Sequence, residues 1–304
     1  MANILLRSPY YVYLTESGGS CATLELSIDG TLRYTLTKDT DDTDSVLFDI
    51  SELARDYLDI TYDGTYTSQT VAITGTVTFL SGCENPITPA QTFSHTGFDG
   101  YGKYLDGSNP TIASGSLMQS NTQIYIPENT AGQVPEEDTN AIDYVTFGTS
   151  ATSVSAGGQT ITINRICEPK YTPVKVTFVN KFGALQDLYF FKKRTDNIST
   201  TKEQYKRSVL ADNGTYDIDV HQKRILNVQG RYNVSMNTGF IGEEMNEVFE
   251  QLLLSEQVWA YIDNTVTPVD ITTSQLTYKT SLNDRLINYT IGVEYAFGVI
   301  NDLR

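Results

Sequence analysis

Short runs rich in Thr, Tyr, Val and Ile fill residues 8–80, and turn-forming residues separate them roughly every 8–12 positions. The runs read YYVYLT, ATLELSI, LRYTLTK, SVLFDI, LDITYDGTY and TVAITGTVTFL. Successive side chains of a strand point to opposite faces, and turns at this spacing are typical of antiparallel sandwiches. We therefore expect a mainly β protein made of antiparallel β-sandwich or barrel domains, with an N-terminal β-sandwich over residues 1–85.

Two further segments follow a composition change at SGCENPITPAQT, where two Pro and one Gly favour a domain boundary. Residues 86–168 predict either a small β domain or a loop-rich elaboration, with ENTAGQVPEEDTN as a surface loop. Residues 169–304 predict a C-terminal β domain. Its strands include QLTYKTS at 275–281 and a final strand whose apolar residues from Ile287 to Phe297 share one face.

One amphipathic helix interrupts this β pattern, at GEEMNEVFEQLLLSEQVWAYI. Apolar residues recur there at helical spacing and glutamates line the opposite side, so we expect a helix over 243–254. Its first turns are acidic, which suits the positive end of the helix dipole. The helix is expected to cover apolar surface of a β barrel through a core face made by Met245, Val248, Phe249, Leu252 and Leu253.

The charge balance limits the partners that such a chain can bind. The protein has 21 basic and 37 acidic residues and a formal net charge of −16, so it repels phosphate groups and should not bind nucleic acid tightly. No apolar run approaches a transmembrane length of about 20 residues, so no membrane span is expected. The N-terminus lacks the apolar core of a secretion signal, which predicts a protein made in the cytoplasm.

No group of residues has the spacing of a catalytic or metal site. Cys21, Cys83 and Cys167 are expected to be small buried hydrophobes in a reducing compartment. His95 and His221 stand alone, and Glu136–Glu137 lies in a polar loop. The sequence also lacks nucleotide-binding glycine motifs. We therefore expect no enzyme activity, no catalytic residues, no metal and no cofactor.

An acidic cluster leaves two interpretations open. Asp39, Asp41, Asp42 and Asp44 in KDTDDTDS could bind Ca²⁺ through carboxylate oxygens, or they could form a solvated hairpin loop. The cluster lacks the glycine and the distal glutamate of an EF-hand loop.

The basic run FFKKRTDNISTTKEQYKR is the clearest charge feature of this acidic protein. It is either a solvated loop after a strand or an extended loop that contacts the acidic surface of a neighbouring subunit. The predicted subunit-contact residues are Lys192, Lys193, Arg194, Lys202, Lys206 and Arg207.

Residues 98–109 hold aromatic and carboxylate side chains that could stack on sugar rings and bind their hydroxyl groups. The possible glycan contacts are Phe98, Tyr101 and Tyr104, with Asp99, Asp106 and Asn109 beside them. The competing interpretation is a Gly/Tyr-rich loop that packs on itself.

Several stretches carry a resemblance to a known group of proteins. They are DGYGKYLDGSNPTI, SLMQSNTQIYIP, ICEPKYTPVKVTFVNKFGALQDLYFFKK, SEQVW and TYKTSLNDRLINYTIGVEYAF, together with RSPYYVYLT, LELSI and ELARDYLDITYDGTYTSQTV. These stretches resemble structural proteins of tailed bacteriophages, particularly marine ones. The expected single helix on a β domain also resembles the building block of phage tail tubes and tail hubs.

The resemblance implies a virion component of the tail, hub or baseplate that acts by forming or docking on a ring. Its partners would be other copies of itself and other tail, neck or baseplate proteins, and it would be assembled in the host cytoplasm. The alternative function is a β-sandwich module that recognises a host surface glycan at the tail tip. A mature virion would be the protein's location in either case.

Overall fold

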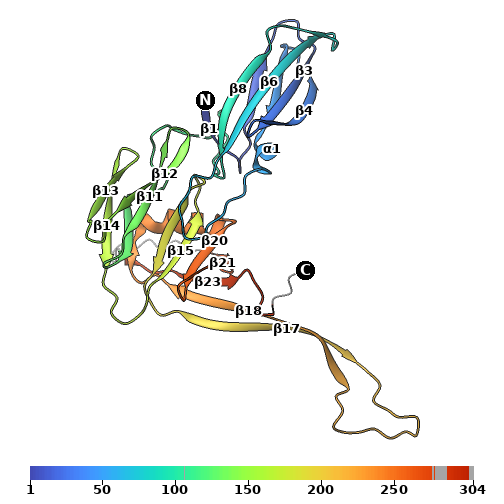
Figure 1. Ribbon diagram of the computed structural model, residues 1–304, viewed down its shortest axis with the longest axis vertical. Coiled ribbons are helices and arrows are strands. Elements are labelled where there is room, and N and C mark those ends of the chain that lie inside the picture. The colour runs from blue at the N-terminus through green and yellow to red at the C-terminus, as the bar shows by residue number, and fades with distance from the viewer. Residues whose placement is uncertain (106, 276, 278–285, 301–304) are drawn as a thin grey trace.

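The computed structural model describes residues 1–105, 107–275, 277 and 286–300 of the 304-residue chain. Strands make up 51% of the structure and helices 6%, which confirms the expected mainly β class. Figure 1 shows an N-terminal sandwich, a central group of short sheets and a C-terminal sheet that continues into a long projecting hairpin.

The N-terminal sandwich comprises β1 (Ala2–Leu5), β2 (Tyr11–Thr15), β3 (Cys21–Ile28), β4 (Thr31–Asp39), β5 (Ser45–Asp49), α1 (Ser51–Arg55), β6 (Val71–Ser81), β7 (Asn85–Pro86), β8 (Gln91–Phe98) and β9 (Thr111–Ile112). Its main sheet has the order β4-β3-β6-β8-β1-β9, and β7 pairs with β6. Alternation along β6 buries Val71, Ile73, Val77 and Phe79. The β2–β5 pair packs on the same core through residues such as Phe48.

Two features of this sandwich differ from the expectation. Strand β1 runs parallel to β8, so the sheet is not wholly antiparallel. The sheet also reaches past the boundary expected after residue 85, because β8 and β9 belong to it. The Pro- and Gly-containing segment 82–90 is therefore a connection within one sheet and not a linker between domains.

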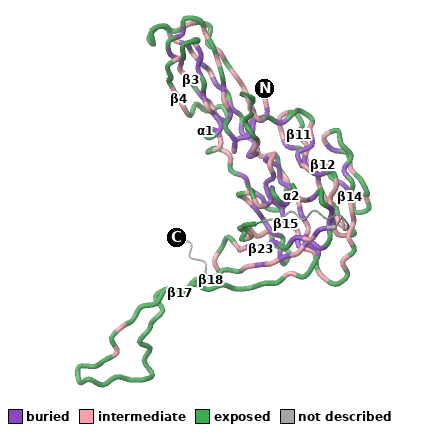
Figure 2. Tube along the Cα trace, turned by 180° about the vertical axis from the view of Figure 1, so that it is seen from behind, coloured by how far each residue is buried: buried purple, intermediate pink, exposed green. Residues whose placement is uncertain are grey.

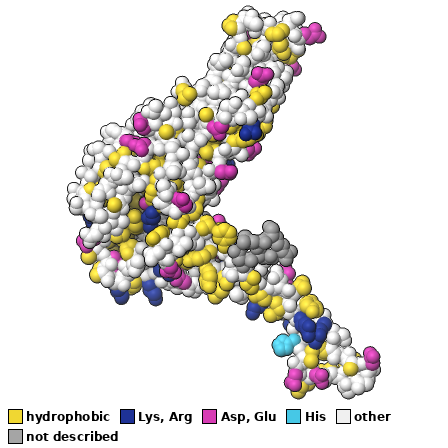
Figure 3. All heavy atoms as spheres, in the orientation of Figure 1, with side chains coloured by type: hydrophobic (Ala, Val, Ile, Leu, Met, Phe, Trp, Pro, Cys, Tyr) yellow, Lys and Arg dark blue, Asp and Glu magenta, His cyan; other side chains and the backbone are white. Residues whose placement is uncertain are grey.

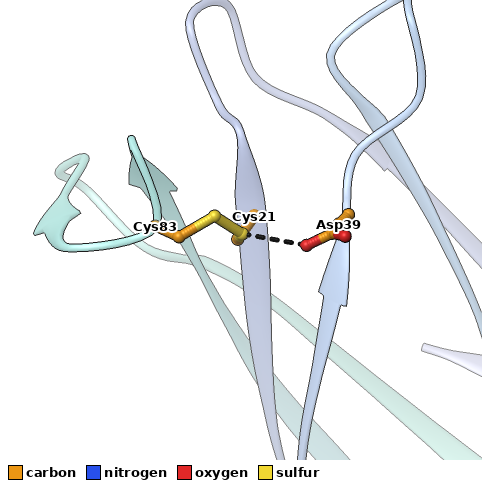
Figure 4. Close-up of side chains that lie close together, drawn as sticks. All are labelled: Cys21, Asp39 and Cys83. Carbon is orange, nitrogen blue, oxygen red and sulfur yellow. Dashed lines mark hydrogen bonds between the residues drawn. A yellow bond between two sulfur atoms is a disulfide. The ribbon is translucent and has the colours of Figure 1, made fainter.

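The cysteine expectation was wrong for this region. Cys21 is buried on β3, but Cys83 is exposed, and the two form a disulfide that joins β3 to the segment after β6 (Figure 4). Asp39 Oδ1 lies 3.2 Å from Cys21 Sγ. The sulfur atoms are bonded to each other, so they are not thiolate ligands for a metal beside Asp39. Cys167 is exposed and not a buried hydrophobe.

The central region contains two small sheets. Its strands are β10 (Gln123–Pro127), β11 (Gly132–Asp138), β12 (Ala141–Phe147), β13 (Ser153–Ala156) and β14 (Gln159–Ile166). Strand β14 lies between β10 and β13, while β11 and β12 form a hairpin. Much of the loop expected at 128–140 is therefore strand β11. Val134, Phe147 and Ile161 lie in a common small core.

The C-terminal sheet contains β15 (Val174–Val179), β16 (Leu185–Phe190), β17 (Thr195–Lys206), β18 (Lys223–Asn237), β20 (Val258–Ile262), β21 (Thr265–Ile271) and β23 (Thr290–Tyr295). Their order is β16-β15-β20-β21-β23-β18-β17, and β19 (Ile241–Gly242) pairs separately with β22 (Leu286–Ile287). Within the described residues the sheet is open, with β16 and β17 at its edges, so the expected barrel is not closed.

The predicted helix is present and packs as expected. A 3₁₀ turn, η1 (Glu243–Met245), leads into α2 (Asn246–Leu254), and the chain becomes extended at Ser255. Of the predicted core face, Met245, Val248, Phe249 and Leu252 are buried and Leu253 is partly buried against them. Burial of the four buried side chains contributes on the order of 10 kcal/mol before the entropy cost. The helix covers one face of the open sheet.

The last predicted strand is confirmed in part. Ile291 and Val293 are buried on β23, which ends at Tyr295, and Phe297 is 55% exposed. Ile287 is also buried, but it belongs to the separate short strand β22, so the predicted strand is divided between two sheets. The strand predicted at 275–281 includes Leu276, Tyr278 and Thr280, which lie outside the described residues, so it remains a prediction.

Candidate interaction surfaces

The most prominent surface of the molecule is a long β-hairpin that leaves the C-terminal sheet (Figure 1). Strand β18 pairs with β23 only over Asn233–Asn237, whereas its pairing with β17 continues out to Lys223. Beyond one backbone bond from Val299 N to Gly230 O, the described residues add no third strand to this ribbon. We call residues 199–231 the arm.

The arm corrects the prediction of a loop at the basic run. All twelve residues of β17 are exposed, and they form a strand instead of a loop after a strand (Figure 2). The arm divides into a two-stranded stalk, residues 199–207 and 223–231, and an irregular tip, residues 208–222. At about 3.3 Å per residue, the twelve residues of β17 span about 40 Å.

The structure separates the six predicted contact residues into two groups. Lys202, Lys206 and Arg207 lie on the exposed stalk, whereas Lys192, Lys193 and Arg194 lie at the root of the arm, before β17 begins.

The root residues differ in their partners. Lys192 Nζ lies 2.6 Å from a carboxylate oxygen of Glu168, and hydrogen bonding to Lys192 lowers the pKa of Glu168. Arg194 pairs with Asp196 on β17 at 3.0 Å and with Asp263 at 3.4 Å. These ion pairs hold the root of the arm against the body of the sheet.

Apolar side chains are exposed along the whole arm. Ile218 in the tip is 86% exposed and Leu226 in the stalk 71%. The other exposed large apolar side chains near or on the arm are Ile198, Tyr205, Leu210, Tyr216, Val220, Ile225 and Tyr232. A two-stranded ribbon in water is only marginally stable, and contiguous exposed apolar residues mark a contact surface. The arm therefore carries an extended apolar surface that is exposed to solvent.

The two parts of the arm carry opposite charges, as Figure 3 shows. Between them, stalk residues 202–207 and 223–228 hold one acidic side chain, Glu203, and the basic side chains of Lys202, Lys206, Arg207, Lys223 and Arg224. The tip holds no Lys or Arg, and its acidic residues are Asp212, Asp217 and Asp219. The stalk is thus basic and the tip acidic.

Two adjoining hollows form a groove beside the root of the arm, which we call the root groove. They measure about 530 and 510 Å³ and share Pro173 and Tyr261 in their walls. The charged side chains of the outer hollow are Lys170, Lys193, Arg194 and Asp263, and Asp263 pairs with Arg194. The groove is therefore locally basic, in a protein whose formal net charge is −16.

The inner half of the root groove is aromatic. Tyr62, from the segment between α1 and β6, and Tyr189, from β16, line it together with Tyr261 of β20. Tyr62 packs edge-on against Trp259 with ring centroids 5.6 Å apart. Three separate stretches of chain thus build this wall, which local sequence patterns do not reveal.

A partly buried polar network forms the floor of the inner half. Lys175 Nζ donates to Tyr62 Oη at 2.9 Å and to Tyr66 Oη at 3.1 Å, and lies 3.7 Å from Asp187. Burial alone would lower the pKa of Lys175, but Asp187 and Tyr62 outweigh it and raise the pKa. Burial and the Asp187 charge raise the pKa of Tyr66. Thr177 also donates to Asp187, at 2.7 Å. Because these groups satisfy one another, the network holds the wall in place.

The predicted glycan platform does not form. Phe98 is fully buried, so it cannot stack on a sugar. The guanidinium carbon of Arg7 lies over the ring of Tyr101, 5.3 Å from the centroid of that ring. Tyr104 is 40% exposed and packs edge-on against Tyr11. The three aromatic residues therefore do not share one exposed face.

The polar residues of that segment have structural contacts instead. Asp99 accepts a bond from Arg55 Nε at 3.2 Å, and Arg55 also pairs with Glu256 just after α2. This contact ties the N-terminal sandwich to the C-terminal sheet. Burial raises the pKa of Asp99 although Arg55 opposes the shift. Asn109 bonds to the backbone of β2, and Asp106 lies outside the described residues.

The acidic cluster at 39–44 does not converge on one point. The Asp41 carboxylate accepts bonds from the hydroxyl and the N–H of Thr43, and these bonds lower the pKa of Asp41. Asp44 accepts a backbone N–H from a different turn, and Asp39 lies beside the disulfide. The described geometry favours the solvated hairpin.

The two histidines remain apart from each other. His95 packs between Tyr10 and Phe93, with ring centroids 5.1 and 5.3 Å away, and burial lowers its pKa. His221 is exposed in the tip of the arm.

The paired carboxylates serve the fold. Glu137 is buried and accepts bonds from Asn3 Nδ2 at 2.7 Å, Gly115 N at 2.5 Å and Asn140 N at 2.8 Å. Burial acts to raise its pKa, but these bonds outweigh burial and lower the pKa. Glu136 likewise accepts a backbone N–H from the turn between β13 and β14. Glu137 therefore links β1 of the sandwich to the central hairpin.

Compared with known proteins, the chain matches no family model, no curated protein and no solved structure. Among the described residues, no helix has both the length and the apolar character needed to cross a bilayer.

Proposed function

We propose that this protein is a structural component of a tailed-bacteriophage virion, in its tail, hub or baseplate, and that its copies assemble through the arm. The observation that carries the proposal is the arm itself. It is a two-stranded ribbon whose β17 residues are all exposed, and it places large apolar side chains in solvent. A contact that buries apolar side chains such as Ile218 and Leu226 stabilises the assembly by about 1.5–3 kcal/mol for each side chain fully covered.

The charge distribution supports contact between copies. The five basic side chains within stalk residues 202–207 and 223–228 stand out from a chain with 37 acidic and 21 basic residues, so a neighbour's body offers the opposite sign. Complementary charges of this kind guide association and select the partner. If the ring surrounds the DNA path, its acidic surplus repels phosphate groups and lets the genome pass without sticking.

Two further observations support a place in a virion. The stretches that resemble tailed-phage structural proteins include β15, β16 and β23, which build the sheet that bears the arm. The Cys21–Cys83 disulfide suits a protein that works outside a reducing cytoplasm, as a released particle does. Other tail, neck or baseplate proteins are then its partners beside its own copies.

The alternative, recognition of a host glycan at residues 98–104, lacks structural support. It needs exposed aromatic faces side by side, and Phe98 is fully buried while Arg7 covers Tyr101.

A shortened arm tests the proposal. Lys202 and Val228 are paired across the ribbon, so residues 203–227 can be replaced by Asn-Gly, which forms a two-residue hairpin turn. Native mass spectrometry and light scattering should find multimers of the 33.8 kDa chain for the natural protein and monomers for the variant. Unchanged Trp259 fluorescence would show that the body of the variant is folded.

Two results would contradict the proposal. One is a natural protein that stays at 33.8 kDa as its concentration is raised. The other is a folded variant that assembles as well as the natural protein does.

A further inference from the structure

We infer that the acidic, apolar tip of the arm docks in the root groove of a second copy of this chain. This inference rests on the proposed function and names the contact through which it operates. The tip and the groove are the two surfaces whose charge and apolar character complement each other.

The tip has the composition of a docking segment. In TYDIDV, residues 215–220, Tyr216, Ile218 and Val220 alternate in sequence with Asp217 and Asp219. The apolar side chains do not close into a core, since they border a hollow of about 350 Å³ within the tip. A free tip of this kind leaves apolar surface in water, which is unfavourable in free energy. A partner that covers this surface removes the unfavourable exposure.

The root groove offers the matching chemistry. Its outer half presents Lys170 and Lys193, which form no ion pair within the part of the chain that the structure describes. Its inner half presents the rings of Tyr62, Tyr189 and Tyr261. Aspartates of the tip pair with the lysines while its aromatic and aliphatic side chains enter the tyrosine-lined half.

The groove that receives a tip belongs to another molecule. The groove lies at the root of its own arm, because Lys193 and Arg194 directly precede β17. The ribbon of β17 and β18 separates root from tip by about 40 Å of paired strand. The arm could fold back onto its own root only if the backbone hydrogen bonds between β17 and β18 broke. The groove that receives the tip therefore belongs to a second copy.

The geometry of such a contact has a consequence for assembly. The tip and the groove are different surfaces, so the interface is heterologous and joins copies head to tail. Repetition of one heterologous contact closes into a ring or continues as a helix. Both outcomes suit a part of a phage tail that is built from many copies.

A reciprocal charge exchange tests the docking. The tip variant is Asp217→Lys/Asp219→Lys, and the groove variant is Lys170→Glu/Lys193→Glu. Each alone should weaken self-association about 10- to 100-fold, because attractive pairs become repulsive. The two variants together in one chain should return the association constant to within about threefold of the natural value.

A matched control changes the same charge elsewhere. Glu25 and Asp42 are exposed on the N-terminal sandwich, so Glu25→Lys/Asp42→Lys adds equal positive charge away from the arm. This control should assemble like the natural protein, measured by sedimentation at the same salt concentration. Weakening as strong as that of the tip variant would assign the effect to net charge and overturn the inference.

A second measurement does not depend on affinity. In a Cys167→Ser background, one chain carries Ile218→Cys and another carries Asn264→Cys at the rim of the groove. A short bismaleimide should join the two different chains when they are mixed. If tip cysteines react only with each other, the tip docks elsewhere and the inference is wrong.

The results separate this inference from the proposed function. If the shortened arm abolishes assembly while the charge variants leave it unchanged, the arm still assembles copies but its tip does not use the root groove. If the natural protein never associates, both proposals fail. Restored association in the combined variant supports both.

Discussion

Replacing Phe249 with Ala should destabilise the C-terminal sheet by about 3–5 kcal/mol, the usual range for a buried Phe. Phe249 is fully buried at the centre of the helix–sheet contact. Its ring lies 4.6 Å from that of Tyr289 and 6.5 Å from that of Phe190, measured between centroids. The variant loses both contacts and leaves a cavity that α2 cannot fill, because the helix is held by the β19–β22 pair on one side and by β20 of the sheet on the other.

The protein contains its own probe for this experiment. Its single Trp, Trp259, lies on β20 and is 9% exposed, so its fluorescence reports unfolding of the C-terminal sheet. Thermal unfolding of Phe249→Ala, followed by this signal, should show a midpoint roughly 10–20 °C below that of the natural protein.

Leu254→Ala is the matched control, since Leu254 ends the same helix and is 48% exposed. It should cost about 1 kcal/mol or less. A Phe249 variant that melts like the Leu254 variant would refute the argument that the helix stabilises the sheet through its buried face.

Three other predictions concern polar and covalent contacts. Glu137→Gln should cost about 1–3 kcal/mol at pH 7. The folded pKa of Glu137 is lowered, so the stability that its carboxylate contributes is present above the unfolded pKa of about 4.3 and is lost as the pH falls below that value. Melting curves from pH 7 to 3 should therefore show the difference in melting temperature between the variant and the natural protein becoming smaller. A constant difference would contradict this. Thiol titration of the unreduced protein should find one free thiol, and Cys21→Ser should lower stability by about 2–4 kcal/mol; three titratable thiols would contradict the Cys21–Cys83 bond. Lys175→Met should cost about 1–3 kcal/mol, and combining it with Asp187→Asn should cost less than the sum of the two single changes; additive costs would mean that the two groups do not interact.

The parts of the fold that could be predicted are those with one buried face. The helix was recognisable because its apolar residues recur at helical spacing, and four of the five are fully covered by the sheet. Strand β6 was recognisable because alternate residues such as Ile73 and Val77 enter the core. In both elements the periodic spacing of apolar residues indicates which face packs in the core and which face is exposed to water.

The arm was mistaken for a loop because it has no buried face. Every residue of β17 is exposed, so polar and charged residues occupy both sides and the alternation of a half-buried strand is missing. The backbone hydrogen bonds of β17 are made with β18, and the sequence of β17 alone does not show which strand it pairs with. The loop expected at 128–140 has a different cause, because β11 does bury Val134, Pro135 and Glu137. A proline and a buried carboxylate are not typical of a strand core, so the segment looked polar, and Thr139 and Asn140, both with positive φ, mark the hairpin turn between β11 and β12.

The root groove and the disulfide could not be predicted because they depend on distant segments. Tyr62, Lys175 and Tyr261 meet only when the segment after α1 packs on the C-terminal sheet. Cys21 and Cys83 are 62 residues apart and belong to no motif, so their pairing follows from the register of β3 on β6 and not from spacing.

The central claim is that the arm exists to bind another copy, and a symmetry-averaged image of the purified assembly tests it most directly. We predict a ring or helix in which each arm lies along its neighbour, with the apolar side chains of the arm covered. Single copies, or a symmetric assembly whose arms project freely into solvent, would contradict the claim.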